Sequence, residues 1–331
     1  MKEPTGTSRL WAVILAGGDG ERTRPFIQEW MGRAIPKQYC TFVGTRSMLQ
    51  HTWDRANRLL VCPRRKVTVL GKNHRLKFPE YFLDRDQGTF LFQPRNCDTG
   101  PGVLLPLTYI KAWDPHAVVA IFPADHFIYP EATFTAMVRR AVHAVEVFKD
   151  RVILLGVRPT HVDLEYGWIV PGKTLGLISG RGIRGIRGFY EKPDLPRGEH
   201  LLAEGALWNT LIMVGTIDTF WELGGACLPY VTKGFDRLRK TIGSAQEGSV
   251  LEGIYRDMPS RNFSRDVLER VVSQLGVMEL DHMLWSDWGR PERIVESLKA
   301  LGRKPSFHFS QSISSVSKVS RSEEGVISKV G

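Results

Sequence analysis

A glycine-rich stretch near the N-terminus carries the residues best suited to chemistry. Residues 13–25, VILAGGDGERTRP, join an apolar run to three glycines and then to Arg22, and Lys37 follows in the downstream sequence PKQ. The glycines are Gly17, Gly18 and Gly20. Bare backbone lets N–H groups approach a phosphate closely, and a guanidinium binds phosphate oxygens through paired hydrogen bonds. This pattern predicts a site for a phosphorylated ligand.

Two well-known glycine motifs differ from this stretch. The dinucleotide fingerprint needs a third glycine where Thr23 stands, and the P-loop needs Lys and then Ser or Thr where Glu21 and Arg22 stand. A tight turn without a ligand, beside ordinary surface cations, is the alternative interpretation. The glycines alone do not decide between a phosphate site of another class and a plain turn.

A carboxylate stands at the end of a second apolar run. In AVVAIFPAD, residues 117–125, a pattern typical of a buried strand ends at Asp125. Ligands of parallel α/β sheets bind at the carboxyl ends of the strands, so this carboxylate is expected at the same edge as the glycine turn. The alternative is that Asp125 caps the following loop.

The elements that must position these residues alternate between strands and helices. Strands are expected at WAVILAGG, KVTVLGKN, TFLFQP, AVVAIFPADH and RVILLGV, and helices from Ser47, after Pro101 and over 131–149. In the last helix a stripe of apolar residues recurs at helical spacing, whereas His143 lies off it. This alternation predicts an α/β fold, a Rossmann-like and mostly parallel mixed sheet with helices on both faces.

The pattern changes after residue 157. Short strands with glycine-rich turns over 158–215 predict an added β-region, and 216–304 is expected to be mainly helical, with VMELDHMLWSDWG as a strand that returns to the site. Residues 301–331 are Ser-rich and are expected to form a loose tail. We therefore predict one domain over about 1–300 with two parts, at about 10–157 and about 158–290, of which the second could hold another half of the ligand.

Composition limits the classes of partner. The 331 residues carry a net charge of +10, which suits nucleic acid or a phosphorylated small molecule, but the charge is spread along the chain. RGIRGIRG at 181–188 is better explained as a turn and strand with solvated arginines than as an RNA-binding segment. Nucleic-acid binding is therefore not expected.

Cysteine usage and hydropathy indicate the compartment. The four cysteines form no CxxC pair and have no spaced His partners, which favours neither zinc nor a disulfide framework and predicts a reducing, cytoplasmic setting. No apolar stretch approaches the roughly 20 residues of a membrane span. We therefore expect no membrane association.

The ordered motifs of the chain resemble those of sugar-1-phosphate nucleotidyltransferases, and the mannose-1-phosphate guanylyltransferase branch above all. Eight stretches carry the resemblance over about residues 10–290: LAGGDGERTRP with PKQ, QPRNCDTGP, FPADHFI, YGWI, FYEKPD, WNTLIMVG, FSRDVLER and WSDWG. The family reaction is an in-line attack by a sugar 1-phosphate on the α-phosphorus of a nucleoside triphosphate, which releases pyrophosphate. Such a transfer depends on alignment and charge neutralisation.

The resemblance implies roles on the triphosphate side of the site. Arg22 would bind the β- and γ-phosphates, Lys37 the phosphates near the reacting centre, and the turn Ala16, Gly17, Gly18 and Gly20 the nucleotide. Asp125 and Asp287, the family's second acid, would together hold Mg²⁺ as an all-oxygen site. A turn-forming role before Gly289 is the alternative for Asp287.

By the same resemblance, residues at about 10–157 would form a nucleotide-binding part and residues at about 158–290 a sugar-binding part, with separate pockets for the base and the sugar. The residues expected to line the base pocket are Gln93, Pro94, Asp98, Thr99 and Gly100. Asp98 and Thr99 are also expected to cap the following helix. Those expected to hold the sugar and its phosphate are Gly167, Glu191, Lys192 and Asn209. An exposed Glu-Lys before proline would otherwise be a solvated turn. Trp168, Trp208 and Trp285 are expected in the core.

Three stretches depart from the family pattern. FIQEWMGRAI, residues 26–35, contains an insertion that is expected to reshape the loop over the triphosphate, and WNTLIMVG and WGRPER differ near the sugar. The chain has no room for the isomerase domain of the longer bacterial enzymes, so isomerase activity is not expected.

The predicted function is the synthesis of GDP-mannose from GTP and mannose 1-phosphate with Mg²⁺. The alternatives are transfer to another sugar 1-phosphate or from another base, and a non-catalytic subunit that binds nucleotide sugars. The resemblance does not decide whether the protein forms a homo-oligomer.

Overall fold

The computed structural model describes residues 9–77 and 88–307. Over these residues nine strands form one sheet in the order β3-β2-β1-β4-β9-β6-β10-β8-β7. The strands are β1 Leu10–Leu15, β2 Lys66–Gly71, β3 Thr89–Gln93, β4 Val118–Pro123, β6 Val152–Val157, β7 Gly167–Ile178, β8 Arg181–Glu191, β9 Leu207–Thr216 and β10 Leu275–Glu279. Strands β1 to β4 run parallel to one another, and β9 is antiparallel to β4 and β6. The mixed, mostly parallel sheet confirms the predicted fold class.

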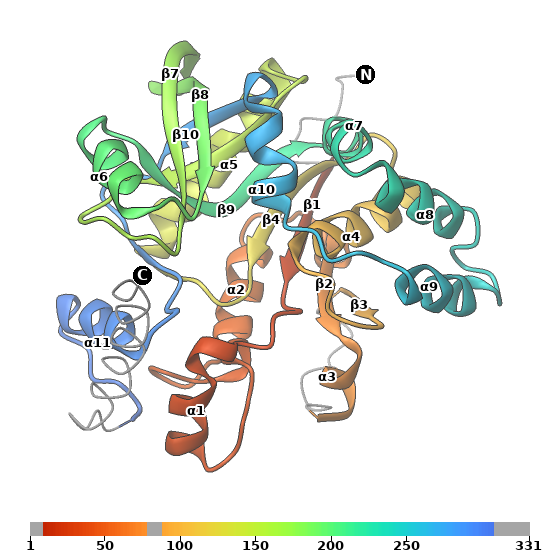
Figure 1. Ribbon diagram of the computed structural model, residues 1–331, viewed down its shortest axis with the longest axis horizontal. Coiled ribbons are helices and arrows are strands. Elements are labelled where there is room, and N and C mark those ends of the chain that lie inside the picture. The colour runs from red at the N-terminus through yellow and green to blue at the C-terminus, as the bar shows by residue number, and fades with distance from the viewer. Residues whose placement is uncertain (1–8, 78–87, 308–331) are drawn as a thin grey trace, which may run out of the picture.

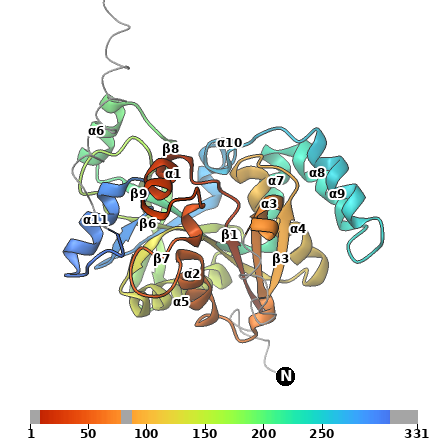
Figure 2. The same ribbon diagram turned by 90° about the horizontal axis from the view of Figure 1, so that it is seen from below.

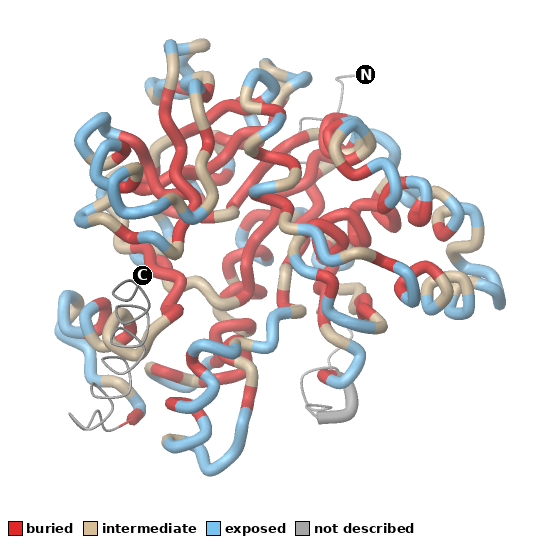
Figure 3. Tube along the Cα trace, viewed as in Figure 1, coloured by how far each residue is buried: buried red, intermediate tan, exposed pale blue. Residues whose placement is uncertain are grey.

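Helices cover both faces of this sheet. The two sets of residues that alternate along β1 enter different cores: Leu10, Ala12 and Ile14 pack with α2 and α5, whereas Trp11 and Val13 pack with α4, α7 and α8. The helices that form these two cores with β1 are α2 Met48–Asn57, α5 Glu131–Val147, α4 Thr99–Trp113, α7 Ile217–Cys227 and α8 Pro229–Arg239. Helices α7, α8 and α9, Glu247–Arg256, form one side of the molecule (Figure 1). Burial follows the sheet, and exposed residues gather in the outer turns (Figure 3).

The expected helices form close to their predicted bounds. Ser47 caps α2 through a capping box with Gln50, in which each side chain bonds the other residue's backbone N–H. Along α5 the apolar stripe is buried and His143 is exposed, as predicted. Helix α4 begins at Thr99, two residues before Pro101, because Asp98 accepts a hydrogen bond from the Thr99 N–H and serves as the N-cap.

Strands β7, β8 and β9 build the added β-region. The β7–β8 hairpin projects from the end of the sheet (Figure 1), and the start of β7 also pairs with β9 through Trp168 and Trp208. RGIRGIRG lies on β8, as predicted. Trp168, Trp208 and Trp285 are buried. Helix α6, Leu195–Ala203, connects β8 to β9.

Two predictions made for the active-site edge need correction. Residues 26–31 of the loop expected over 26–35 belong to the helix α1, Arg24–Met31, because Phe26 and Ile27 bury an apolar face. VMELDHMLWSDWG contains two strands, because β10 pairs with β6 in the large sheet whereas β11, Leu284–Ser286, pairs with β5, Phe127–Tyr129. A short 3-10 helix, Lys37–Tyr39, follows the loop after α1.

The described C-terminal residues pack against the N-terminal part of the chain. Helices α1 and α11, Pro291–Ala300, lie toward the same side of the molecule in both orientations (Figures 1 and 2). Phe307 is buried, with its ring centroid 4.9 Å from that of Phe26 and 5.3 Å from that of Trp30. The prediction of a loose tail from residue 301 is therefore wrong for Phe307, and the rest of that prediction, residues 308–331, lies outside the described part of the chain.

The remaining described helices are short. They are α3 Lys72–Lys77 and α10 Phe263–Asp266. The four cysteines are free thiols. In the described ranges no helix is long and apolar enough to cross a membrane.

Candidate active site

The glycine turn follows β1 and is held by its neighbours. Gln38 Nε2 donates hydrogen bonds to the carbonyl oxygens of Ala16 and Gly18 at 2.8 and 2.9 Å. A Cβ atom on Gly17 would lie 2.7 Å from Gln93 Oε1. Gly20 has a φ of 64°, which lies in the left-handed region that favours glycine. The glycines therefore allow a close backbone turn at the carboxyl edge of the sheet, where the sequence predicts the triphosphate.

Lys37 provides a buried cation beside this turn. Its side chain is 5% exposed, and its Nζ lies 2.9 Å from Asp125 Oδ2 and donates a hydrogen bond to the Asp287 carbonyl oxygen. Burial acts to raise the pKa of Asp125, but Lys37 and His126 together outweigh it and hold that pKa below its ordinary value. Lys37 therefore lies between the two predicted acids and keeps Asp125 ionised.

A small sheet brings the two acids together. Asp125 precedes β5 and Asp287 follows β11, and these strands pair in the register Phe127 with Ser286. Asp287 Oδ1 accepts hydrogen bonds from Tyr166 Oη, Arg293 Nη1 and the Gly289 N–H at 2.7, 2.7 and 2.9 Å. Burial acts to raise the pKa of Asp287, but Lys37 and Arg293 hold it well below its ordinary value. Asp287 is thus more than a turn former before Gly289.

Arg22 reaches across the site to carboxylates of the part that is predicted to bind the sugar. Its Nη1 lies 2.8 Å from Glu165 Oε2, and its Nη2 lies 3.2 Å from Asp287 Oδ2. Burial acts to lower the pKa of Arg22, whereas Glu165 and Asp287 raise it to a net value above the ordinary one. The side chain is still 52% exposed, so its guanidinium remains accessible to a ligand.

The predicted base-pocket residues gather where β3 ends and α4 begins. Gln93 Nε2 donates to Tyr255 Oη at 3.1 Å, which leaves its Oε1 facing the Gly17 turn. Thr99 Oγ1 accepts a hydrogen bond from the Phe263 N–H, and the Gly100 N–H donates to the Arg261 carbonyl oxygen. Thr99 and Gly100 therefore anchor residues 261–263 beside α4, as well as standing in the predicted pocket.

Three of the four predicted sugar residues meet at the start of β7. A Cβ atom on Gly167 would lie 2.7 Å from Glu191 Oε2 and 3.3 Å from Asn209 Cβ. Burial, with the like charge of Glu269 in support, raises the pKa of Glu191. Lys192 follows with a φ of 52°, and its N–H donates to the Tyr166 carbonyl oxygen at 3.1 Å. Gly167 thus leaves room for the Glu191 carboxylate beside Asn209.

The donor set suits Mg²⁺ held jointly with phosphates. Within residues 9–77 and 88–307 no group of three or more His, Cys, Asp or Glu side chains is placed to hold a metal ion. Mg²⁺ usually takes one or two carboxylates and completes its shell with water and substrate phosphate oxygens. Asp125 is partly exposed, with its Oδ1 4.0 Å from His126 Nε2, and Asp287 Oδ2 has a 3.2 Å contact with Arg22. The two residues therefore fit the ion's oxygen preference.

Four residues of this network were missed in the sequence. Glu165 and Tyr166 stand before Gly167, and Arg290 and Arg293 stand in WGRPER. Arg290 donates hydrogen bonds to the Glu165 carboxylate from Nε and Nη2. Arg293 forms ion pairs with Asp163, Glu165 and Asp287. The departure of WGRPER from the family pattern was the available signal, but it did not identify Glu165 as the partner.

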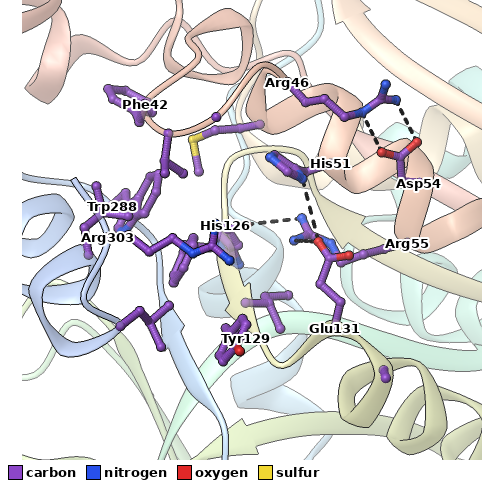
Figure 4. A pocket seen from close by; sticks show the side chains of 18 of the residues that line it. Phe42, Arg46, His51, Asp54, Arg55, His126, Tyr129, Glu131, Trp288 and Arg303 are labelled. Carbon is purple, nitrogen blue, oxygen red and sulfur yellow. Dashed lines mark hydrogen bonds and ion pairs between the residues drawn. The ribbon is translucent and has the colours of Figure 1, made fainter. Parts of the chain in front are cut away.

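A cavity of about 990 Å³ adjoins the site behind residues 126 and 288. Figure 4 shows Phe42 and Trp288 on one side of it and Arg46, His51 and Glu131 on the other. Its charged residues are largely paired with one another: Arg46 with Asp54, and Arg58 with Glu131. Arg55 donates to the carbonyl oxygen of His126, which links this cavity to the residue after Asp125.

The fold and site define a class of protein. A glycine turn after the first strand, cations beside it and two carboxylates at the same sheet edge are features of enzymes that handle phosphorylated nucleotides. The family model "Nucleotidyl transferase" matches residues 11–303, and the chain belongs to this family.

Curated relatives are longer than the matched region. The chain is 26% identical over 306 residues to a mannose-1-phosphate guanylyltransferase of Escherichia coli, a match of 91% of this chain and 63% of the relative. It is 31% identical over 206 residues to the xanthan biosynthesis protein XanB of Xanthomonas campestris pv. campestris (strain B100), which covers 61% of this chain and 41% of the relative. The chain therefore spans about two fifths to two thirds of these relatives.

A solved structure shares the fold over most of the chain. A crystal structure described as mannose-1-phosphate geranyltransferase from Thermus thermophilus superposes with a TM-score of 0.73 and 25% identity. The match covers 87% of this chain and 79% of that one. A UDP-glucose pyrophosphorylase complexed with UDP-glucose, at 16% identity and a TM-score of 0.54, shares the fold alone.

Proposed function

We propose that this protein transfers a nucleotidyl group from a nucleoside triphosphate to a sugar 1-phosphate, with GTP and mannose 1-phosphate as the preferred pair. An oxygen of the sugar phosphate forms the new bond to the α-phosphorus, the bond between that phosphorus and the bridging oxygen to the β-phosphate breaks, and pyrophosphate leaves. The observation that carries the proposal is the convergence of Lys37, Asp125 and Asp287 beside the glycine turn.

The chain's own residues divide the work between two substrates. Arg22 and the turn at Gly17–Gly20 would bind the triphosphate, and Gln93 would meet the base beside Gly17. Glu191 and Asn209 would hold the sugar hydroxyls, because a half-buried carboxylate supplies acceptors and a buried amide supplies both donors and an acceptor. Lys192 would bind the sugar phosphate. Lys37 would stabilise charge near the α-phosphate without reorganising, because it is already fixed by two partners.

The metal would be held by Asp125 and Asp287. When bound, Mg²⁺ would neutralise charge on the phosphate oxygens. The residues that hold it are kept ionised by Lys37 and Arg293 in the resting site. A reducing cytoplasmic setting fits the four free cysteines.

A substrate panel tests this proposal. Four nucleoside triphosphates would be assayed against several sugar 1-phosphates with Mg²⁺, and pyrophosphate release is expected only when both substrates are present, with GTP and mannose 1-phosphate fastest. Silence across the whole panel would refute the transferase proposal. Asp125→Ala should lower kcat/KM by about 10²–10³-fold while the protein still folds, since loss of one group that stabilises transition-state charge typically has this effect.

A non-catalytic nucleotide-sugar-binding subunit is the second candidate. The observation that favours it is the engagement of both Asp287 oxygens by hydrogen-bond donors and Arg22. Calorimetry would then show binding of GTP or GDP-mannose by a protein that is silent in the panel.

A further inference from the structure

One carboxylate beside the site contacts three arginines. Glu165 lies in the turn before β7, where its N–H donates to Asp163 Oδ1 at 2.9 Å. Its Oε2 lies 2.8 Å from Arg22 Nη1 and 2.9 Å from Arg293 Nη2, and its Oε1 lies 2.8 Å from Arg290 Nη2. Glu165 therefore joins Arg22, from the nucleotide-binding part, to two arginines at the start of α11.

Arg22 uses for these contacts the nitrogens that a phosphate would need. Its Nη1 faces Glu165 and its Nη2 faces Asp287, so a phosphate that binds both nitrogens competes with these two carboxylates for the guanidinium. Ion pairs of a half-exposed side chain contribute only about 0–1 kcal/mol. The Arg22 contacts are thus weak enough for a triphosphate to displace.

The other contacts in the cluster survive such an exchange. Glu165 keeps Arg290 and Arg293 when Arg22 leaves, so its charge stays paired. Asp287 keeps Tyr166, Arg293 and the Gly289 N–H on Oδ1, while its Oδ2 loses the Arg22 contact. The departure of Arg22 therefore releases Asp287 Oδ2 from its contact with the guanidinium.

Gly289 provides an independent sign that Arg22 is seated here. A Cβ atom at this position would lie 2.8 Å from Arg22 Nη2 and 2.5 Å from Asp287 Oδ2. Real Cβ atoms essentially never approach so closely, so any side chain at position 289 would push the guanidinium or the carboxylate away. The absence of a side chain at residue 289 lets Arg22 reach Asp287.

We propose that Glu165 is a positioning residue that competes with the triphosphate for Arg22. Rather than binding substrate, it holds Arg22 against the sugar-binding part, and it thereby sets the affinity for polyphosphate. When the triphosphate displaces Glu165 from Arg22, the guanidinium binds phosphate oxygens and Asp287 Oδ2 becomes available to the cation. This inference rests on the proposed function, because it assumes that Arg22 binds the nucleotide's phosphates.

The test is a double-mutant cycle between Arg22 and Glu165. Calorimetry without Mg²⁺ would measure binding of inorganic tripolyphosphate and of GTP to the wild type, Glu165→Gln, Arg22→Gln and the double variant. Glu165→Gln should tighten tripolyphosphate binding about 3- to 5-fold, since a competing ion pair of up to roughly 1 kcal/mol is removed. The same substitution in the Arg22→Gln background should change the Kd less than 2-fold or so, because Arg22 carries the effect.

Two further variants separate local competition from general charge. Glu204→Gln removes one negative charge at the Arg187 ion pair, away from the site, and should leave the Kd unchanged. Glu165→Asp retains the charge but shortens the reach to Arg22, so intermediate tightening is expected, and this variant keeps a carboxylate for Arg290 and Arg293 should Glu165→Gln fold poorly.

The possible outcomes have distinct meanings. Equal tightening with and without Arg22, tightening by Glu204→Gln, or no tightening in either Glu165 variant would overturn the role of Glu165 and leave the proposed function standing. If the wild type and every variant bind neither tripolyphosphate nor GTP, the proposed function falls and the role of Glu165 falls with it.

Discussion

Replacing Lys37 with methionine removes the cation that lies between the two acids. Lys37 Nζ makes one ion pair with Asp125 and one hydrogen bond with the Asp287 carbonyl oxygen, and the side chain is 5% exposed. Hydrogen bonds that involve a charged group contribute about 1.5–3 kcal/mol each. Methionine recovers part of this free energy because it buries an unbranched apolar chain of similar length. The Asp125 side chain is 37% exposed, so its carboxylate can be solvated by water once the ammonium is gone. The expected net loss is about 1–3 kcal/mol in the free energy of unfolding.

The loss of activity should be larger than the loss of stability. Lys37 is fixed where charge develops near the α-phosphate, and removal of one such preorganised group typically lowers kcat by about 10²–10³-fold. Urea unfolding would measure stability, and pyrophosphate release from GTP and mannose 1-phosphate would measure kcat and KM. Lys111→Met is the matched control, since Lys111 pairs with the exposed Asp218 and its loss should change stability by no more than about 0.5 kcal/mol.

Either of two results for Lys37→Met would refute this reasoning. Wild-type stability would show that the buried ammonium contributes nothing net to the fold. Wild-type kcat/KM in a folded variant would show that Lys37 acts only as a structural partner of Asp125.

Three further predictions concern stability. The pKa of Glu191 is raised in the folded protein, so ionisation of this side chain destabilises the fold as pH rises above the unfolded pKa of about 4.3. Glu191→Gln should therefore raise the free energy of unfolding at pH 7 and make it depend less on pH above that value. Urea unfolding profiles that match the wild type across this pH range would contradict the prediction. Phe307→Ala removes an aromatic ring packed on α1 and should lower stability by about 2–4 kcal/mol, whereas a loss below about 0.5 kcal/mol would show that the segment is not docked. Gly100→Ala places a Cβ atom 2.6 Å from the Arg261 carbonyl oxygen and should lower the thermal midpoint through a loss of about 1–3 kcal/mol, which an unchanged midpoint would disprove.

Local patterns were sufficient to predict the sheet edge and its first residues. The apolar run that ends in Gly17 and the one that ends in Asp125 both form parallel strands, β1 and β4, and they are neighbours in the sheet. The apolar stripe over 131–149 predicted α5 because its spacing follows the helix period. These features depend on residues that are close in sequence, so they can be predicted from the amino-acid sequence alone.

Other features were predicted less well because distant partners decide them. The helix α1 forms where a loop was expected, since Phe26 gains burial against Phe307, more than 250 residues later in the chain. The β11 pairing with β5 was missed because a three-residue strand has no pattern of its own.

The sequence by itself determined the class of fold, the glycine turn with its cations, and the candidate acids Asp125 and Asp287. Only the tertiary structure decided how these acids are used: it places Lys37 between them and brings Arg22 to Asp287 across 265 positions of sequence. The physical reason is that strand and helix patterns arise from neighbouring residues, whereas an ion-pair network forms between side chains that only folding brings within a few ångströms. Glu165, which carries no motif, becomes visible as a partner of Arg22 only in that network.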